Sequence, residues 1–247
     1  MINYIPGLVS YILPTFNRGD SFLRNKIHNI CKQTYQNWDL HIMDDGSTDN
    51  TYDIYIELSE KYPDRKIYYD RLVNNSRFPS IPRNWGICKS KGEYIAHIDD
   101  DSICDPYKLE ILVELLNDTT KTVAFGQRAN LDLRLGKYTE ITSMSEYNPF
   151  NGTGLDTGQF IYRREVYNKI PLVFAKKACD WELLKKIHSM APYSFVSTSK
   201  LVTTYLWHNS NRSHMNRIWE KTIVEPKTYE HIFEQYKKEY QINLDPV

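Results

Sequence analysis

The sequence predicts an α/β fold in which helices flank a mixed, mainly parallel central sheet. In the first half of the chain, short apolar runs typical of strands alternate with segments whose apolar residues recur at helical spacing. Repeated strand-to-helix steps favour a parallel sheet with helices on its faces. A length of 247 residues is enough to bury one sizeable core. We therefore expect a single domain over residues 1–247.

The first half contains three strand-to-helix steps and a fourth strand. The residues LVSYIL form an apolar run that Pro14 closes, and helical spacing begins at Asp20. Turn-forming residues, DDGSTDN, separate the next strand from its helix. The expected elements are, in order, a strand at 8–13, a helix from 20, a strand at 40–43, a helix at 51–61, a strand at 66–70, a helix at 84–89 and a strand at 94–98.

The second half is patterned more weakly. We expect a helix at 106–117, strands at 122–127 and 201–207, and a helix at 180–190. The polar stretch at 127–158 has room for a hairpin and a loop. The tail after residue 210 is rich in Tyr and Lys, with helical content expected after Pro226.

Composition excludes several classes of protein. The 31 Lys and Arg residues balance 31 Asp and Glu residues, so no net field attracts nucleic acid. The four cysteines are scattered and form no C-x-x-C pair, which argues against a zinc site and suits a reducing compartment. The N-terminus lacks a basic leader and the chain lacks a long apolar run. We expect a cytoplasmic protein without an integral membrane segment, with peripheral attachment to a membrane left open.

Polar side chains gather where the predicted strands end. In parallel sheets ligands bind beyond the carboxyl ends of the strands, which here are residues 14–18, 44–47 and 99–102. Asp99 and Asp101 flank a single residue, so both carboxylates can reach one hard cation and leave coordination positions for phosphate oxygens. Taken alone, three consecutive aspartates are more often a solvated turn. Ligand-suited residues at the two other strand ends favour the cation site.

Four segments together resemble the family 2 glycosyltransferases, which have the nucleotide-diphosphosugar transferase (GT-A) fold. They are SYILPTFNR at 10–18, IMDDGSTDNT at 42–51, IPRNWGICKSKGEYIAHIDDDS at 81–102 and ACDWELLKKI at 178–187. Each motif is weak alone, but the four in this order are specific. The resemblance covers the first half of the chain well and the next 90 residues or so loosely. It implies a nucleotide-sugar-binding half at 1–105, an acceptor-side half at 106–209 and a helical tail at 210–247.

The resemblance implies a donor site built from the first two strand ends and a short helix. The loop that contacts the nucleobase would be Pro14, Thr15, Phe16 and Asn17. Asp45 matches the carboxylate that hydrogen-bonds the base, commonly uracil, while Asp44 is assigned to structure. Arg83 matches a guanidinium that can bind diphosphate oxygens through two hydrogen bonds. Core packing for Phe16, a capped turn for DDGSTDN and a surface position for Arg83 remain alternatives.

The resemblance also implies a divalent metal, Mn²⁺ or Mg²⁺, at the acidic triplet. Asp99 would contact the ribose or the metal, and Asp101 would hold the metal against the diphosphate. Asp100 is the variable residue between them and is placed with the donor-binding residues. Ser102 stands where a third carboxylate is frequent, and His208 resembles a late metal- or diphosphate-binding histidine. For His208 a surface or packing role is as good an explanation.

Asp180 matches the family's general base, at the start of a helix beyond the acceptor loop. A carboxylate there is also an ordinary helix cap. The resemblance implies an inverting hexosyl- or N-acetylhexosaminyltransferase that moves a sugar from a nucleotide donor, with a UDP-sugar favoured, to a hydroxyl of a saccharide or protein. A homo-oligomer is possible.

Two rival functions use the same residue types. A non-catalytic sugar-nucleotide or glycan-binding module would keep the fold without the reaction, but the joint presence of Asp99, Asp101 and Asp180 argues against it. A sugar nucleotidyltransferase shares a related sheet and carboxylate-bound metal. Such enzymes usually carry a glycine-rich basic loop after the first strand, and LPTFNRGD has none.

Overall fold

The computed structural model describes residues 3–19, 21–99, 102–132, 137–142, 155–173, 179–191 and 194–207. Its elements, in chain order, are β1 Ile5–Thr15, α1 Ser21–Ile30, β2 Trp38–Asp44, α2 Thr51–Lys61, β3 Ile67–Arg71, α3 Ser80–Lys89, β4 Gly92–His97, β5 Ser102–Cys104, α4 Lys108–Leu115, β6 Val123–Asp132, β7 Lys137–Thr142, the 3-10 helix η1 Thr157–Gln159, β8 Phe160–Arg163, the 3-10 helix η2 Arg164–Asn168, α5 Cys179–Met190 and β9 Phe195–Trp207.

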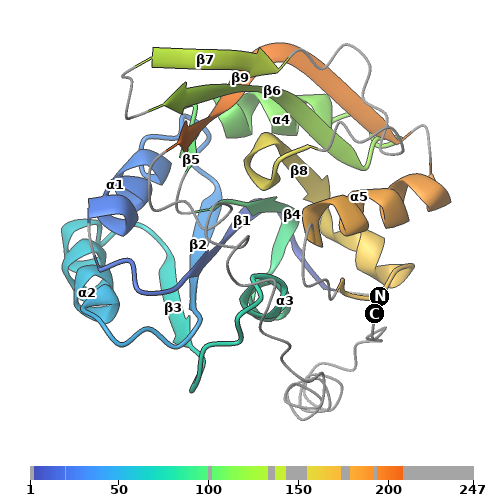
Figure 1. Ribbon diagram of the computed structural model, residues 1–247. Coiled ribbons are helices and arrows are strands. Elements are labelled where there is room, and N and C mark those ends of the chain that lie inside the picture. The colour runs from blue at the N-terminus through green and yellow to red at the C-terminus, as the bar shows by residue number, and fades with distance from the viewer. Residues whose placement is uncertain are drawn as a thin grey trace, which may run out of the picture.

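Within the described residues one sheet runs through the molecule in the order β3-β2-β1-β4-β8-β6-β9-β5, and β7 pairs with β6 (Figure 1). The first four strands pair in parallel, as the strand-to-helix alternation predicts. Beyond them the sheet becomes mixed, because β8 lies antiparallel between β4 and β6 while β6 and β9 are parallel. The expected α/β fold with helices around a central sheet is confirmed.

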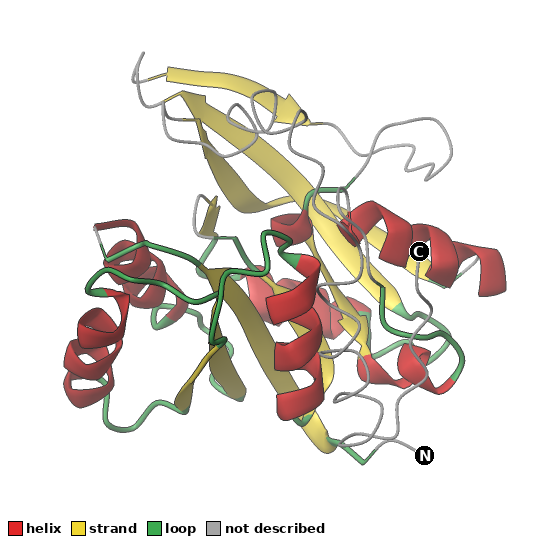
Figure 2. Cartoon of the chain, turned by 60° about the horizontal axis from the view of Figure 1, so that its bottom comes forward, coloured by secondary structure: helices red, strands yellow, loops and turns green. Residues whose placement is uncertain are grey.

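Two apolar layers hold the helices on opposite faces of the sheet (Figure 2). Side chains of successive strand residues point to opposite faces, so Tyr11 and Leu13 join one layer while Ile12 joins the other. The layer with Tyr11 also takes the apolar residues of α1, α2 and α4. The layer with Ile12 takes those of α3 and α5. The sheet is thus buried on both faces, and its functional groups gather where the strands end.

The first-half elements lie where the apolar periodicity predicts them, except that α3 begins at Ser80 instead of 84 and β1 is longer than expected at both ends. The expected strand ends before Pro14, whereas β1 continues to Thr15. Pairing of β1 with β4 stops at Ile12 and His97, and the Ile12 carbonyl accepts from the Ile98 N–H. Along a strand, the N–H and C=O groups of every second residue face the same neighbouring strand, so those of Pro14 face the same side as those of Ile12. Proline has no N–H, and β4 has already ended at this point, so no pairing with β4 is lost. Pairing with β2 continues through Pro14 and Met43.

The second half holds an inner strand, β8, that the sequence pattern does not predict. Two arginines follow its short apolar run, and both are buried, with Arg163 8% and Arg164 4% exposed. Arg163 pairs with Glu93 at 2.6 Å and donates to the Lys121 carbonyl. Arg164 donates to the carbonyls of Gly92 and Ile87 at 2.6 and 2.7 Å. These charges therefore fasten β8 to β4 and α3 instead of marking a surface.

The hairpin that the polar stretch at 127–158 has room for is formed by β6 and β7, which pair antiparallel along one edge of Figure 1 with β9 beside them. The helix expected at 106–117 is shorter, spanning Lys108–Leu115. Among the described helices, none is long and apolar enough to cross a membrane. The tail at 210–247 lies outside the described residues.

Candidate functional site

The ends of β1 and β2 lie side by side and carry the first group of predicted residues. Thr15 pairs with Asp44 in the parallel register, and the next N–H, that of Asp45, donates to the Thr15 carbonyl at 2.8 Å. Thr15 is buried, whereas Pro14 and Phe16 are partly exposed. The predicted nucleobase loop is therefore joined through the backbone to the residue that carries the predicted base-binding carboxylate.

The two neighbouring aspartates have different surroundings. Asp44 accepts at one oxygen from the Ser47 N–H and hydroxyl at 2.8 and 2.6 Å, and at the other from the Tyr69 hydroxyl. These contacts fix the turn, in agreement with a structural role for Asp44. Asp45 is 5% exposed, and its Oδ1 accepts from the Ser76 N–H at 2.8 Å. A carboxylate beside the end of β1 can hold a nitrogen donor of a flat ring.

Gly46 allows a second loop to close over this turn. Its φ of +81° is a conformation that favours glycine, and an added Cβ would lie 2.7 Å from the Asn74 carbonyl carbon and 2.8 Å from the Asn75 nitrogen. Loop 74–76 can therefore approach the turn closely enough for Ser76 to donate to Asp45. The glycine of the DDGS segment therefore allows the contact that holds the Asp45 side chain.

Asn17 ties the β1 loop to the loop after β2. Its φ is +50°, a value that asparagine tolerates better than most residues. Its N–H donates to the Ser47 hydroxyl at 2.7 Å, and its side-chain oxygen accepts from the Thr48 N–H at 2.8 Å. The exposed Asn17 is thus used for holding the loop, and its amide nitrogen is the part of the side chain best suited to meet a ligand.

The third predicted group joins α3 to the end of β4. Arg83 is 7% exposed, and its Nη2 forms an ion pair with Oδ1 of Asp99, whose side chain is 32% exposed. The same nitrogen lies 3.3 Å from the Thr157 hydroxyl. Arg83 is therefore an interior residue, contrary to the surface alternative. The two residues predicted to meet the diphosphate are in contact with each other.

Asp180 meets this group from the other half of the chain. It lies at the start of α5, where its Oδ1 accepts from the Trp181 N–H at 3.0 Å and its Oδ2 accepts from the Thr157 hydroxyl at 3.2 Å. Thr157 is 3% exposed. A chain of contacts therefore runs from Asp99 through Arg83 and Thr157 to Asp180, linking the end of β4 to the start of α5.

Asp156 adds a carboxylate that the sequence reasoning missed. Its oxygens contact Nη1 of Arg128 at 2.9 Å and the Gly158 N–H at 3.0 Å. Burial raises the pKa of Asp156, the charges of Asp99 and Asp180 raise it further, and Arg128 opposes them. The signal for this segment is D-x-x-Q before an apolar run, a helix-start pattern that forms a full capping box between Asp156 and Gln159.

His97 lies in the interior and packs against Tyr162, outside the chain of contacts from Asp99 to Asp180. Its Nε2 is 2.8 Å from the Tyr162 hydroxyl, and the two rings stack with centroids 5.6 Å apart. Burial lowers the pKa of His97 well below the usual value, and the charges of Arg83 and Lys108 lower it further. The residue is therefore a neutral packing histidine.

The model of the family "Glycosyl transferase family 2" matches residues 10–201, most of the chain. The chain belongs to the family 2 glycosyltransferases. A similar curated protein of this class is the poly(ribitol-phosphate) β-N-acetylglucosaminyltransferase TarP of Staphylococcus aureus, 36% identical over 132 residues, which are 53% of this chain and 36% of TarP. The chain spans about half the length, or less, of the first curated relatives it matches.

Solved structures establish the fold of this family member as GT-A. S. aureus TarS 1–349 in complex with UDP-GlcNAc has a TM-score of 0.70 and 19% identity, over 96% of this chain and 68% of TarS 1–349. The mannosyltransferase PcManGT of Pyrobaculum calidifontis, in complex with GDP-Man and Mn²⁺, has a TM-score of 0.67 and 16% identity, over 92% of this chain and 69% of that protein. At these identities the likeness concerns the fold.

Of the predicted metal ligands of this family member, Asp99 lies within the described residues. Asp100, Asp101 and His208 lie outside the described residues, and within the described part no three His, Cys, Asp or Glu side chains form a metal-binding group. Asp99 supplies a hard, partly exposed carboxylate. Asp156 lies near this carboxylate, and burial is the largest cause of its raised pKa, with the charges of Asp99 and Asp180 adding to it.

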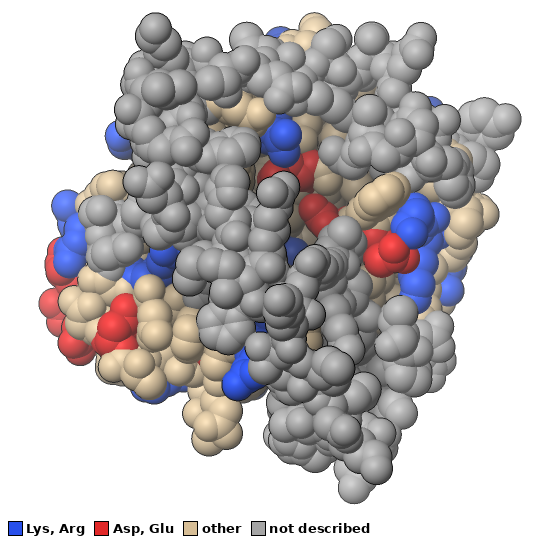
Figure 3. Space-filling view, in the orientation of Figure 1, with Lys and Arg blue, Asp and Glu red and all other residues tan. Residues whose placement is uncertain are grey.

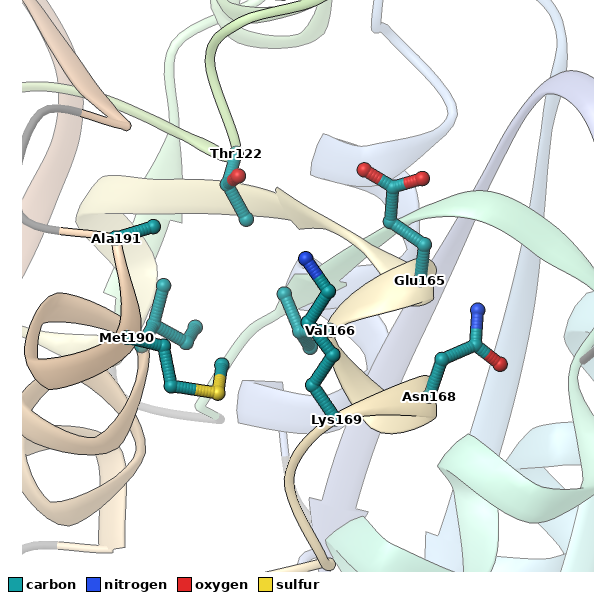
Figure 4. Close-up of a pocket in the computed structure, with 8 residues that line it drawn as sticks. Thr122, Glu165, Val166, Asn168, Lys169, Met190 and Ala191 are labelled. Carbon is teal, nitrogen blue, oxygen red and sulfur yellow. The ribbon is translucent and has the colours of Figure 1, made fainter.

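The face drawn in Figure 3 shows acidic side chains at its recessed centre, with basic ones close by, surrounded by residues drawn in grey. A separate cavity of about 140 Å³ lies elsewhere, lined by residues of η2 and the end of α5 together with Thr122 (Figure 4). Met190 of its lining is ten residues from Asp180 on the same helix, a rise of roughly 15 Å. This cavity is therefore distinct from the site around Thr157.

Proposed function

We propose that this protein transfers a sugar from a UDP-linked donor to a hydroxyl of a saccharide acceptor, with inversion at the anomeric carbon. One observation carries the proposal: Arg83 and Asp99, at the donor-side strand ends, are joined through Thr157 to the carboxylate of Asp180. Family membership and the complex of the structurally similar TarS with UDP-GlcNAc support an N-acetylhexosamine as the sugar. The name of the relative TarP supports the same class.

The donor would lie across the ends of β1, β2 and β4. Asp45 would accept a hydrogen bond from the base, and the partly exposed ring of Phe16 would pack on it. Arg83 would turn part of its guanidinium toward the diphosphate, where charge-assisted hydrogen bonds are strongest. Asp99 and, from outside the described residues, Asp101 would hold a divalent metal, with His208 as a further ligand. Such a metal neutralises the leaving diphosphate when it is bound.

Asp180 would be the general base. An acceptor hydroxyl gives its proton to the carboxylate while its oxygen bonds to the anomeric carbon, and the bond between that carbon and the diphosphate oxygen breaks with release of UDP. Attack from the face opposite the diphosphate inverts the configuration, through an oxocarbenium-like transition state. Hydrogen bonds from the Trp181 N–H and the Thr157 hydroxyl keep the carboxylate oriented for this step.

Asp180→Asn tests the assignment. The amide cannot accept the hydroxyl proton, so we expect the rate of UDP release in the presence of acceptor to fall about 10²- to 10⁴-fold. UDP affinity should stay within about threefold, because the change leaves the β1, β2 and β4 ends intact. Asp53→Asn, at an exposed position on α2, is the matched control and should keep the wild-type rate.

The outcomes separate the enzyme from the binding module. UDP release by the wild type, lost in Asp180→Asn and kept in Asp53→Asn, supports the transferase. Wild-type UDP binding without release from any UDP-sugar, over a panel of saccharide acceptors with Mn²⁺ or Mg²⁺, would favour the binding module. An Asp180→Asn enzyme with the wild-type rate would remove Asp180 as the base and leave the transferase assignment in place.

A further inference from the structure

The hydroxyl of Thr157 lies between two charged groups of the site. Nη2 of Arg83 is 3.3 Å away, and Oδ2 of Asp180 is 3.2 Å away. Both distances are at the long end for hydrogen bonds. The sequence signals that locate Arg83 and Asp180 do not locate Thr157, which no motif of the chain marks.

The chemistry of the two partners fixes the direction of the hydrogen bonds. A guanidinium has only donors, so the Thr157 oxygen accepts from Arg83. A hydroxyl has one hydrogen, and the other neighbour of Thr157 is a carboxylate oxygen, so that hydrogen goes to Asp180. The Thr157 hydroxyl thus connects the guanidinium of Arg83 to the carboxylate of Asp180.

We propose that Thr157 is a positioning residue for the transfer: its hydroxyl holds the carboxylate of Asp180 in its orientation, and ties the base to the arginine on the donor side. The inference rests on the proposed function of Asp180 as the base. It adds that a movement of the Arg83 side chain on donor binding is transmitted to Asp180 through the Thr157 hydroxyl. Because Arg83 also pairs with Asp99, the state of the donor side and the orientation of the base are linked.

The backbone around Thr157 is held firmly enough for this role. Asp156 and Gln159 close a capping box around η1, and the amide of Gln159 donates to the Gly126 carbonyl at 3.0 Å. The fully buried Lys108 donates to the Gly158 carbonyl at 2.7 Å. A short helix fixed at three points keeps the threonine side chain in place, so the loss of its hydroxyl removes a contact without freeing the segment.

Thr157→Val and Thr157→Ser form the test. Valine keeps the shape and removes the hydroxyl, while serine keeps the hydroxyl. Thr203→Val is the matched control, because Thr203 is 1% exposed and its hydroxyl donates to a backbone carbonyl, that of Ile103, at 3.0 Å. Melting temperatures report folding, and Thr157→Ala supplies a second hydroxyl-free variant if valine does not fold.

We expect Thr157→Val to lower kcat about 10- to 100-fold, because a hydrogen bond to a charged group is lost. The KM for the UDP-sugar should stay within about threefold of the wild-type value. Thr157→Ser should recover most of the rate, and Thr203→Val should resemble the wild type in both kcat and KM.

An unchanged kcat in the hydroxyl-free variants would overturn the proposal. So would a loss of rate that serine does not recover, or a rise in KM with kcat unchanged. Each of these results leaves the transferase assignment in place, provided that the wild type releases UDP and Asp180→Asn does not. A wild type without UDP release would instead overturn the proposed function, and the role of Thr157 with it.

Discussion

His97 shows how burial decides the chemistry of a single side chain. The imidazole carries a hydrogen bond to Tyr162 and lies within the influence of two cations, Arg83 and Lys108. Burial in the first place, and then these charges, keep its pKa well below the usual value. A protonated His97 would place a third positive charge near those of Arg83 and Lys108. The neutral ring therefore belongs to the packing that holds Arg83 in place.

Because the pKa of His97 is lowered by folding, the stability of the protein should decrease as the pH falls. Near neutral pH His97 is uncharged in both states, but below about pH 6.5 it takes up a proton in the unfolded chain alone. The free energy of unfolding should therefore fall as pH drops from 7.5 toward 5.5, and His97 should contribute up to about 1.4 kcal/mol per pH unit. In His97→Gln, urea unfolding at these pH values should give a shallower decline. An equally steep decline would contradict the assignment of His97 as the neutral histidine.

The sequence locates the residues that have a family motif and misses those that act through burial. Asp45, Arg83 and Asp180 could be named because their motifs mark them, and all three lie at the ends of the expected elements. Arg163 could not be recognised, because an arginine after an apolar run normally signals the surface. Its partners become visible only when Glu93, 70 residues away, is brought beside it.

Helix α3 connects packing to the position of Arg83. Gly86 faces the sheet, and an added Cβ would lie 2.6 Å from Cγ2 of Ile12 and 2.9 Å from Cγ of Met43. The absence of a side chain lets the helix lie close to β1 and β2. Arg83, one turn earlier on the same helix, thereby reaches Asp99.

Gly86→Ala should destabilise the protein even though alanine is the better helix former. Alanine gains roughly 1 kcal/mol in helix propensity, whereas overpacking of a close contact costs about 1–3 kcal/mol. The branched Ile12 cannot turn away freely, so we expect a net loss of up to about 2 kcal/mol by urea unfolding. Lys89→Ala, at an exposed position in the same helix, should change stability by no more than about 0.5 kcal/mol. A stabilised Gly86→Ala would show that the sheet accommodates the methyl group.

The elements of the first half could be predicted because each strand is a continuous apolar run bounded by turn residues. β8 was not predicted because it is four residues long and its apolar residues are followed by two arginines. β5 was not predicted because it has only three residues. Both are held by strands far away in the sequence, β4 and β6 for the first and β9 for the second. Local periodicity carries no information about such partners.

Ligand binding should stabilise the whole molecule in a metal-dependent manner. UDP at 100 times its Kd adds about 2.7 kcal/mol, which corresponds to a rise in Tm of roughly 5–11 °C for a domain of this size. We expect this rise with Mn²⁺ present and a clearly smaller one with EDTA. Asp45→Ala should lose most of the rise relative to its own unliganded Tm, whereas Asp53→Ala should keep it. Equal shifts with Mn²⁺ and EDTA would argue against the proposed metal.

The position of β8 between β4 and β6 affects the order in which the chain can fold. The sheet cannot be completed while the first hundred residues stand alone, because β4 pairs on one side with residues 161–163. Strand pairings of this sequence separation close slowly, since the chain loses loop entropy before the contacts repay it. During synthesis the edge of β4 stays open until β8 emerges, so this edge of the nascent chain is exposed to wrong pairing, from which a chaperone would protect it.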